Sequence, residues 1–369
     1  MKLSKRIFVF CLLLELSFSF PVGLCQTNNA LDNQAKIGIF YYVWWDTTSS
    51  NSWDDTCVDI PVLSSYNSYD STIISQHLTM IEELGIDFVI ISWWGTEDGF
   101  GRFTDMSAKQ VFQIANSSQT SLKFAILVEP FDTENKTYDH AAIYDQIYTD
   151  FFLPYSTLYY CEDGNPLICF YNDPGNAPSL TDCECMPLDA RFTCKIVGEE
   201  PYTHWMYLDL VRPVVREKEV SVTPRYDESR LADRSMGIQI DPRLDEGVYD
   251  QEWEKAIQLW QLGQVETILI SSWNEFYERT AIEPHFDATA VDPNPYFLYA
   301  KTEYYIAELR QSTLVPTEEL SSTPSLTVTS SAQTLSMSII PEYPSAQLIF
   351  ALLIAFTTVI LAFKNSYRE

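Results

Sequence analysis

The chain has 369 residues, with 23 lysines and arginines against 51 aspartates and glutamates, which gives a formal net charge of −28. Because phosphate binding requires positive charge, this balance excludes a general binder of nucleic acid or of anionic lipid. Apolar residues make up 46% and aromatic residues 14% of the chain. That is ample for a hydrophobic core and excludes an intrinsically disordered protein.

Residues 1–25 have the pattern of a secretory signal peptide. A basic stretch that ends at Arg6 is followed by an apolar stretch from Ile7 to Phe20, and small residues stand just before Gln26. We expect cleavage before Gln26, with an uncleaved anchor as the alternative. Residues 26–310 then carry 18 basic and 46 acidic residues, so the net charge of −28 belongs to this middle segment.

Apolar and amphipathic segments alternate along residues 26–310. Asp70 or Ser71 can cap the first predicted helix, and Gly85 ends it. The predicted strands are 37–42, 88–93, 122–128, 166–171, 193–197, 206–210, 219–223 and 267–271. The predicted helices are 73–84, 106–116, 138–151, 252–262 and 295–309.

About eight strands, mostly separated by helices, favour a single (β/α)8 barrel of the TIM type. A doubly wound open sheet is the second choice. No Gly-rich phosphate loop follows any of the strands, which weakens a nucleotide-binding interpretation and leaves no cofactor to expect.

The C-terminal end predicts one membrane span. Residues 346–363 form an uncharged run of 18 residues, about the shortest that crosses a hydrocarbon core. The basic residues of the tail 364–369 are typical of the cytoplasmic side. Residues 311–345 are rich in Ser, Thr and Pro, which is typical of an extended stalk. We therefore expect a single-pass cell-surface protein, attached to the membrane by its C-terminal helix, with an extracellular or lumenal N-terminal domain.

Six cysteines lie outside the predicted signal peptide. An even number in an exported chain predicts up to three disulfides, with 15 possible pairings. Zinc is the competing interpretation, but Cys183 and Cys185 are separated by a single residue and no pair of histidines lies nearby. We therefore expect disulfides and no metal. The six are Cys57, Cys161, Cys169, Cys183, Cys185 and Cys194.

Aromatic and acidic residues follow several predicted strands. In a (β/α)8 barrel the chemistry lies at these carboxyl ends. Flat rings stack on sugar faces, and carboxylates bind hydroxyl groups and transfer protons. Packing in the core is the alternative for any single Trp or Tyr. The candidate sugar-binding residues are Tyr42, Trp44, Trp93, Trp94, Glu129, Tyr226, Asp227, Asn274 and Tyr277.

Glu275 and Glu278 follow the last predicted strand and are the sharpest candidates for catalysis. Glycoside hydrolysis usually uses two carboxylates, one of which protonates the leaving oxygen. Two glutamates three residues apart reach one cleft if the turn is tight. A solvated acidic loop is the alternative in a chain of this charge. Glu129 and Glu283 are further candidates of the same kind.

Several stretches resemble one known family. SSWNEFYERTAIEP resembles the S-x-N-E-W-H-E-G-T-x-I-E-P stretch of glycoside hydrolase family 99, the endo-α-mannosidase and endo-α-mannanase family. IFYYVWW, VEPF and VTPRYDESR resemble other family stretches in the same order, between about Lys36 and Leu309. The resemblance implies a (β/α)8 barrel that cleaves internal α-mannosidic bonds with retention and without metal.

The resemblance also implies roles for single residues. Glu275 would act as a base on the sugar's 2-hydroxyl group, which then attacks its own anomeric carbon to give a 1,2-anhydro sugar. Glu278 would protonate the leaving oxygen and later activate water. His77 matches a family position, with a buried structural histidine as the alternative. The implied sugar contacts are Tyr42, Trp93, Trp94, Glu129, Tyr226 and Asp227.

This chain departs from the family pattern around the two acids. Tyr277 stands where the family has His, and Arg279 stands in place of a Gly. An ion pair between Arg279 and Glu278 would favour the charged form of that acid, which is unfavourable for a proton donor.

The leading hypothesis is a surface-anchored, endo-acting glycosidase for glycans that contain α-mannose. One alternative is a non-catalytic glycan-binding or cell-envelope protein on a hydrolase scaffold. Another is a related barrel hydrolase for a different α-glycan, such as an α-glucan. The two glutamates favour an enzyme, whereas the changes at Tyr277 and Arg279 favour a binding protein.

Overall fold

The chain divides into two units, 1–316 and 317–369, and the residues that can be described belong to the first. The computed structural model describes residues 34–49, 52–97, 99–130, 139–171, 189–198, 205–206, 215–231, 238–240, 247–288 and 293–314. The predicted signal peptide 1–25, the span 346–363, the tail 364–369 and nearly all of the stalk 311–345 lie outside these residues. Among the described residues, no helix is both long and apolar enough to cross a membrane.

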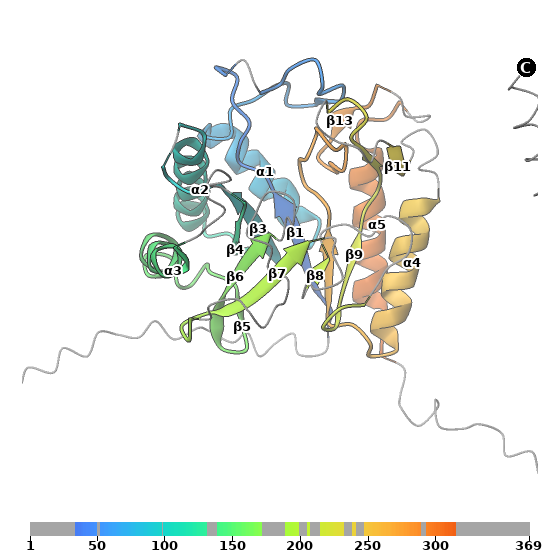
Figure 1. The fold of residues 1–369 in the computed structure, drawn as a ribbon. Coiled ribbons are helices and arrows are strands. Elements are labelled where there is room, and N and C mark those ends of the chain that lie inside the picture. Colours follow the sequence, from blue (N-terminus) through green and yellow to red (C-terminus); the bar gives the residue numbers. More distant parts are fainter. Residues whose placement is uncertain are drawn as a thin grey trace, which may run out of the picture. The chain divides into compact units, whose positions relative to one another are not determined.

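Eight parallel strands lie side by side in the order of the chain (Figure 1), and they form a ring that is hydrogen-bonded everywhere except between β8 and β9. Each strand pairs with the strand before or after it, and β1, the first, also pairs with β12, the last. The hydrogen-bonded order ends at β8 and β9, whose Cα atoms approach within 8 Å. This arrangement fits the predicted (β/α)8 barrel. The strands are β1 (Lys36–Tyr41), β3 (Phe88–Trp93), β4 (Lys123–Val128), β6 (Asn165–Tyr171), β7 (Thr193–Gly198), β8 (Trp205–Met206), β9 (Glu219–Val222) and β12 (Thr267–Ile270).

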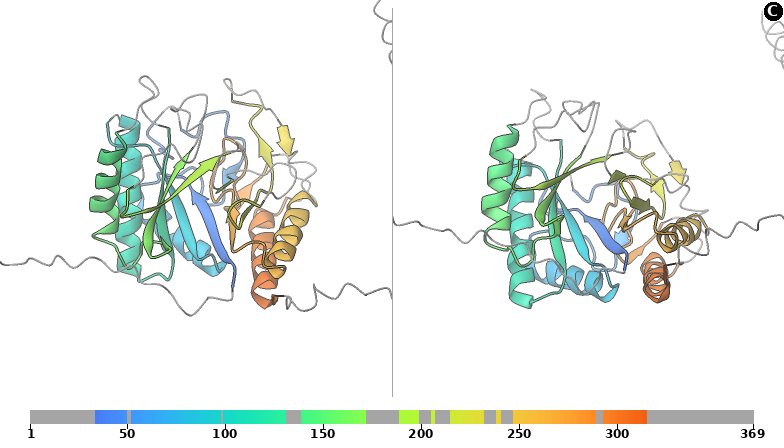
Figure 2. Two further views of the ribbon diagram at one scale, coloured as in Figure 1. Left: turned by 60° about the horizontal axis from the view of Figure 1, so that its bottom comes forward. Right: turned by 90° about the horizontal axis from the view of Figure 1, so that it is seen from below.

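Helices cover the outside of the ring. Figure 2 shows α2 and α3 on one side of the strands and α4 and α5 on the other. The carboxylate of Asp70 caps α1 by accepting a hydrogen bond from the Thr72 N–H at 2.7 Å, as one of the two predicted caps. Gly85 follows this helix with φ +81°, a conformation that favours glycine. The helices are α1 (Ser71–Glu83), α2 (Gly99–Ser118), α3 (His140–Ile147), its wider π-helical continuation η1 (Tyr148–Phe152), α4 (Val248–Gln261) and α5 (Phe297–Gln311).

Three pairings of short strands lie outside the ring. β2 (Ile60–Pro61) pairs with β13 (His285–Phe286), and β10 (Tyr226–Asp227) pairs with β11 (Ile238–Ile240), both antiparallel. β5 (Cys161–Glu162) forms a hairpin with β6. Two-residue strands have no periodicity that a sequence could reveal. β2, β10, β11 and β13 all belong to segments that follow barrel strands, so they lie at the carboxyl face where the site is expected.

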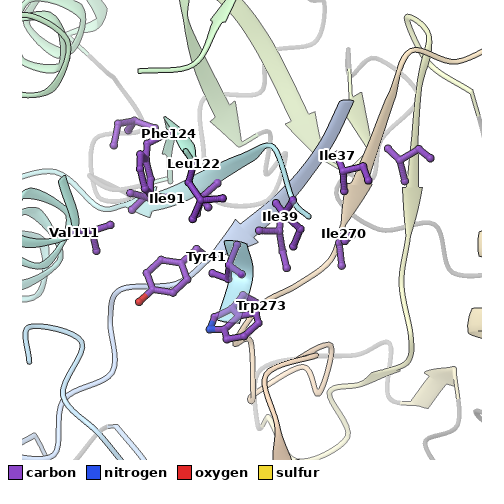
Figure 3. Close-up of a cluster of buried hydrophobic side chains, with 14 of the residues drawn as sticks. Ile37, Ile39, Tyr41, Ile91, Val111, Leu122, Phe124, Ile270 and Trp273 are labelled. Carbon is purple, nitrogen blue, oxygen red and sulfur yellow. The ribbon is translucent and has the colours of Figure 1, made fainter. Parts of the chain in front are cut away.

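Side chains alternate between two cores. On β1, Ile37, Ile39 and Tyr41 pack toward the helices, whereas Phe40 packs inside the ring. Figure 3 shows part of the outer core, in which these three residues lie near residues from β3, β4, β12 and α2. Gly38 faces the interior, where a Cβ atom would lie 2.4 Å from the Phe88 ring. Side chains therefore fill the interior of the barrel, so the site has to be formed by the loops at the carboxyl ends of the strands.

The prediction of up to three disulfides is only partly correct. Cys161 is disulfide-bonded, whereas Cys57, Cys169 and Cys194 form no disulfide, so three bonds among the six cysteines do not form. Cys169 and Cys194 lie on neighbouring strands, but Cys169 faces the barrel interior and Cys194 the outer core, so their side chains point to opposite sides of the sheet. Cys183 and Cys185 lie outside the described residues, and any pairing of theirs stays a prediction.

Replacing Gly38 by alanine should destabilise the barrel. The new methyl group would meet both Phe88 and Leu269, at 2.4 Å and 2.8 Å, so one strand or both side chains must move. Overpacking of this kind costs roughly 1–3 kcal/mol. Urea denaturation followed by tryptophan fluorescence measures the change in the free energy of unfolding. Gly99→Ala is the control, because nothing lies within 4 Å of the added atom. Equal stability of the two variants would contradict the packing described here.

Candidate active site

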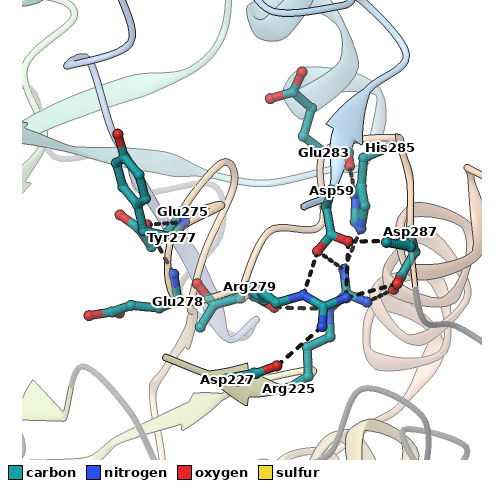
Figure 4. A network of polar contacts seen from close by, with 12 residues as sticks. Asp59, Arg225, Asp227, Glu275, Tyr277, Glu278, Arg279, Glu283, His285 and Asp287 are labelled. Atoms are coloured by element: carbon teal, nitrogen blue, oxygen red, sulfur yellow. Dashed lines mark hydrogen bonds and ion pairs between the residues drawn. The ribbon is translucent and has the colours of Figure 1, made fainter. Parts of the chain in front are cut away.

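The turn after β12 is closed by its own side chains. The Ser272 hydroxyl accepts a hydrogen bond from the Glu275 N–H at 2.9 Å, and the Thr280 N–H donates to the Glu275 carbonyl at 3.0 Å. The Glu275 carboxylate accepts from the N–H groups of Tyr277 at 2.7 Å and Glu278 at 3.3 Å (Figure 4). These contacts hold the two glutamates in one tight loop, and the two N–H donors stabilise the charged form of Glu275.

Asn274 fastens this turn to the end of β1. Its side chain accepts from the Tyr42 N–H at 2.8 Å and donates to the Tyr42 carbonyl at 2.9 Å and the Tyr66 hydroxyl at 3.0 Å. Its backbone carbonyl accepts from the Trp45 indole at 3.0 Å. Asn274 is completely buried, so we revise its predicted role from sugar contact to positioning of the turn.

A cleft of about 720 Å³ opens beside the turn. Glu275 and Glu278 both line it, so the structure brings the two predicted acids to one space. Trp44, Trp94 and Tyr277 line the same cleft, and the rings of Trp44 and Trp94 lie 6.1 Å apart. The other lining residues are Asp46, Ser49, Ser52, Asp54, Thr56, Gly99, Phe100, Phe103, Arg230 and Leu231.

Tyr277 is the cleft residue that departs from the family pattern. Its ring stacks on Trp45 at 4.9 Å, and Trp45 stacks on Trp53 at 4.2 Å. Burial, and then the nearby Cys57 and other acidic groups, raises the pKa of the Tyr277 phenol. A histidine here would titrate near neutral pH. Tyr277 instead stays uncharged, and the stack holds it in place.

Two predicted sugar contacts are core residues. Trp93 is 1% exposed, packs in the outer core, and donates its indole N–H to Asp105 of α2 at 3.1 Å. Tyr226 is completely buried in the barrel interior and donates to Glu228 at 2.6 Å. The expectation for both is corrected, because strand alternation directs Trp93 away from the mouth and the interior encloses Tyr226.

Tyr42, Glu129 and Asp227 lie close to the mouth but are buried. Tyr42 lies beneath Trp44, with ring centroids 4.4 Å apart. Asp227 accepts hydrogen bonds from the Ser229 N–H and from Arg279. In the part of the chain that the structure describes, these three residues are not among those that line the cleft. Their predicted contact with a sugar stays a prediction.

His77 is a buried structural residue. Its Nδ1 lies 2.9 Å from the Tyr41 hydroxyl and its Nε2 lies 3.2 Å from Glu283. Tyr66 donates to the other oxygen of Glu283 at 2.8 Å. His77 and Glu283 are both completely buried, which favours the structural alternative for His77 and removes Glu283 from the candidate acids.

A cluster of buried charges lies behind the turn (Figure 4). Arg279 donates to both oxygens of Asp59, at 2.8 and 2.9 Å, and to Asp287 at 2.9 Å. Arg225 also pairs with Asp59 and Asp287 and donates to the His285 ring. Figure 4 shows the Arg279 and Glu278 side chains leaving the turn in opposite directions. The guanidinium therefore pairs with the aspartates and points away from Glu278. We call Asp59, Arg225, Asp227, Arg279, His285 and Asp287 the buried charge cluster.

The two arginines set the protonation of this cluster. Burial alone would raise the pKa of Asp59, but Arg225, Arg279 and His285 together outweigh it and hold that pKa below its usual range. Burial, and then Arg225, lowers the pKa of His285 to about 4. His285 donates from Nδ1 to the Glu283 carbonyl at 2.6 Å, as a neutral imidazole can.

The same cluster is the one place where described residues group as metal ligands. Ligand atoms of Asp59, His285 and Asp287 lie within 4.8 Å of one another. Both guanidinium groups already occupy these atoms, and two cations beside the site disfavour a third. The described residues therefore fit an ion-pair cluster better than a metal centre.

Sequence reasoning missed the long loop after β1 and the buried charge cluster. The loop supplies Asp46, Ser49, Ser52, Asp54 and Thr56 to the cleft. Its length, between the first strand and the first helix, was the available signal, because such loops build the sites of barrels. The cluster had no signal, since its members come from three separate segments.

No protein-family model and no curated protein matches the chain. Its fold is similar to a solved structure of the GH99 endo-α-mannosidase from Bacteroides thetaiotaomicron in complex with Bis-Tris-propane, with 20% identity and a TM-score of 0.54 over 74% of this chain and 97% of that one. A second structure of the enzyme from that organism has 18% sequence identity and a TM-score of 0.52, over 74% of this chain and 97% of that one. A glycoside hydrolase-like protein has 13% sequence identity and a TM-score of 0.50, over 80% of this chain and 98% of that one. The shared fold fits the predicted barrel and supports the family 99 resemblance.

The charge cluster predicts a loss of stability in mild acid. The unfolded chain protonates His285 near pH 6.5, whereas the folded chain resists protonation until about pH 4. Stability should therefore fall as the pH drops from 6.5 to 4, by on the order of 3 kcal/mol from this residue. His285→Gln, whose amide oxygen can still accept from Arg225, should flatten this part of the curve.

Thermal unfolding between pH 7.5 and 4 measures the effect. The account of the cluster is contradicted if His285→Gln and the wild type lose stability in parallel.

Proposed function

We propose that this chain is an endo-acting, retaining glycoside hydrolase that cleaves α-mannosidic linkages in glycans. One observation carries the proposal: Glu275 and Glu278 line one cleft together with Trp44, Trp94 and Tyr277. A pair of carboxylates beside aromatic rings suits the cleavage of sugars. The family 99 resemblance and the fold shared with endo-α-mannosidase structures support the choice of linkage.

The surroundings of the two acids support different roles. Glu275 is 2% exposed and accepts two backbone N–H groups, which suits a carboxylate that acts as a base. It would take the proton of the 2-hydroxyl group while the oxygen attacks the anomeric carbon. Glu278 is half-buried at the cleft and would protonate the departing oxygen. Water activated by Glu278 then opens the 1,2-anhydro sugar, and Glu275 returns its proton to the 2-oxygen.

Charge in the cleft favours an uncharged glycan. The lining contains the carboxylates of Asp46, Asp54, Glu275 and Glu278, with Arg230 as the cation among the described lining residues. A phosphorylated or sulfated glycan would be repelled by this lining and by the net charge of −28. Neutral mannose oligomers meet no such barrier and can stack on the indole rings.

Position at the cell surface is part of the proposal. The signal peptide predicted at residues 1–25 and the span predicted at residues 346–363 support this location. A protease added to intact cells should release fragments of the domain, and alkaline washing should leave the full chain in the membrane pellet. Recovery of the full chain in the alkaline wash would contradict the anchor.

A glycan-binding protein without turnover is the second candidate. Tyr277 favours it, because a half-buried phenol with a raised pKa does not replace the proton chemistry of the family's histidine. This candidate predicts that the cleft binds mannose oligomers but releases no new reducing ends. A glycan panel that includes α-mannans and α-glucans, with detection of reducing ends and of binding, separates the two candidates and identifies the linkage.

Removing either acid should abolish turnover. Glu275→Gln and Glu278→Gln keep the size of the side chain but cannot exchange the proton, so we expect kcat to fall about 10²–10⁴-fold for each. The double variant should be little worse than the single ones, because the two acids act in one reaction. Release of reducing ends from an α-mannan measures kcat.

Glu303→Gln is the matched control, since Glu303 is exposed on α5. It should keep wild-type activity. Activity that survives in both active-site variants would overturn the assignment of Glu275 and Glu278.

A further inference from the structure

Arg279 adopts a backbone conformation that favours glycine. Its φ of +59° lies in the left-handed region, where a residue with a side chain is strained by about 1–3 kcal/mol. The family pattern has Gly at this position, and glycine adopts such a φ without cost. This chain keeps the shape of the turn with an arginine, so the surroundings must hold Arg279 there.

The buried charge cluster supplies that hold. The Arg279 side chain is 5% exposed, and it pairs with Asp59 through two atoms, with Asp287 at 2.9 Å and with Asp227 at 3.2 Å. Paired hydrogen bonds from a planar guanidinium to one carboxylate fix its orientation. Asp59 and Asp287 also neutralise Arg225, so the two arginines can lie side by side.

The backbone of the turn is held by the same cluster. Arg225 donates its Nε–H to the Arg279 carbonyl at 2.9 Å, and the Asp227 N–H donates to the Glu278 carbonyl at 2.9 Å. Segments that follow three barrel strands therefore meet at residues 278 and 279. Asp59 comes from the segment after β1, Arg225 and Asp227 from the one after β9, and Asp287 from the one after β12.

This geometry determines where Glu278 can point. With the Arg279 side chain anchored behind the turn, the preceding side chain leaves on the opposite side, as Figure 4 shows. That side is the cleft, which Glu278 lines. The anchor thus fixes the direction of the proton donor and not only the stability of the loop.

We infer that Arg279 is a positioning residue for Glu278, which it holds toward the scissile bond through the buried charge cluster. The inference rests on the proposed function. It explains the departure from the family pattern as a replacement: a strained, anchored arginine takes the place of a flexible glycine. Arg279 acts through Glu278 and does not itself touch the sugar.

The test uses the full-length protein and two variants. Arg279→Gly permits the same φ but removes the anchor, and Arg279→Lys keeps the charge but not the paired hydrogen bonds. A misplaced reacting group can cost about 10²-fold in rate, so we expect Arg279→Gly to lower kcat by about that factor with KM within about twofold of the wild type. The kcat of Arg279→Lys should lie between that of Arg279→Gly and that of the wild type.

Two further readouts separate positioning from plain stability. The limb of the kcat–pH profile that reports the proton donor should shift in Arg279→Gly, because a Glu278 free to move changes its surroundings. Millimolar guanidinium should restore part of kcat in Arg279→Gly. Arg310→Gly is the control: Arg310 pairs with Asp87 at 2.8 Å beneath the barrel, so its loss should lower the melting temperature and leave kcat and the pH profile unchanged.

The outcomes are distinct. A wild-type kcat and pH profile in Arg279→Gly would overturn the inference while leaving the proposed function intact. If Arg279→Gly does not fold, Arg279→Lys decides by the same measurements, and a wild-type kcat there overturns the inference. A wild-type chain that cleaves no glycan would sink the proposed function, and the inference with it.

Discussion

The site depends on the closure of the barrel between its first and last strands. β1 and β12 pair from Lys36 opposite Thr267 to Ile39 opposite Ile270. Beyond the last pair, the side chain of Asn274 continues the ladder by bonding both the N–H and the carbonyl of Tyr42. A side-chain amide thus satisfies two buried backbone groups that would otherwise be costly. Because of this closure, the aromatic loop after β1 and the acidic turn after β12 meet at one cleft.

The carboxyl face is then held by buried charge in addition to the aromatic cluster around Trp45. Arg225 and Arg279 are two of the 23 cationic residues in a strongly acidic chain, and both lie behind the turn. Their aspartate partners keep them neutralised, which a buried guanidinium requires. The consequence is a rigid base for Glu275 and Glu278, on which a loop of unusual backbone conformation can persist.

The sequence predicted the helices and strands well, but it predicted poorly in which direction individual side chains point. Strand 88–93 is found with the same bounds, and Asp70 caps the first helix. Trp93 was expected to line the site because it ends a strand, but the alternation of side chains along the strand places it in the outer core. Cys161 is disulfide-bonded but three other cysteines are not, since an even count of cysteines does not give the direction in which each side chain points. Residue type and order are visible in a sequence, whereas the face of a strand depends on register.

The sequence by itself determined the order of strands and helices, the acidity of the domain, and the pair of glutamates after the last strand. These follow from local periodicity and composition, which need no knowledge of distant contacts. Only the tertiary structure decided which aromatic rings share a cleft with those glutamates, and that Arg279 serves Asp59, Asp227 and Asp287. Such contacts join residues up to 220 positions apart, and closure of the barrel alone brings them within reach.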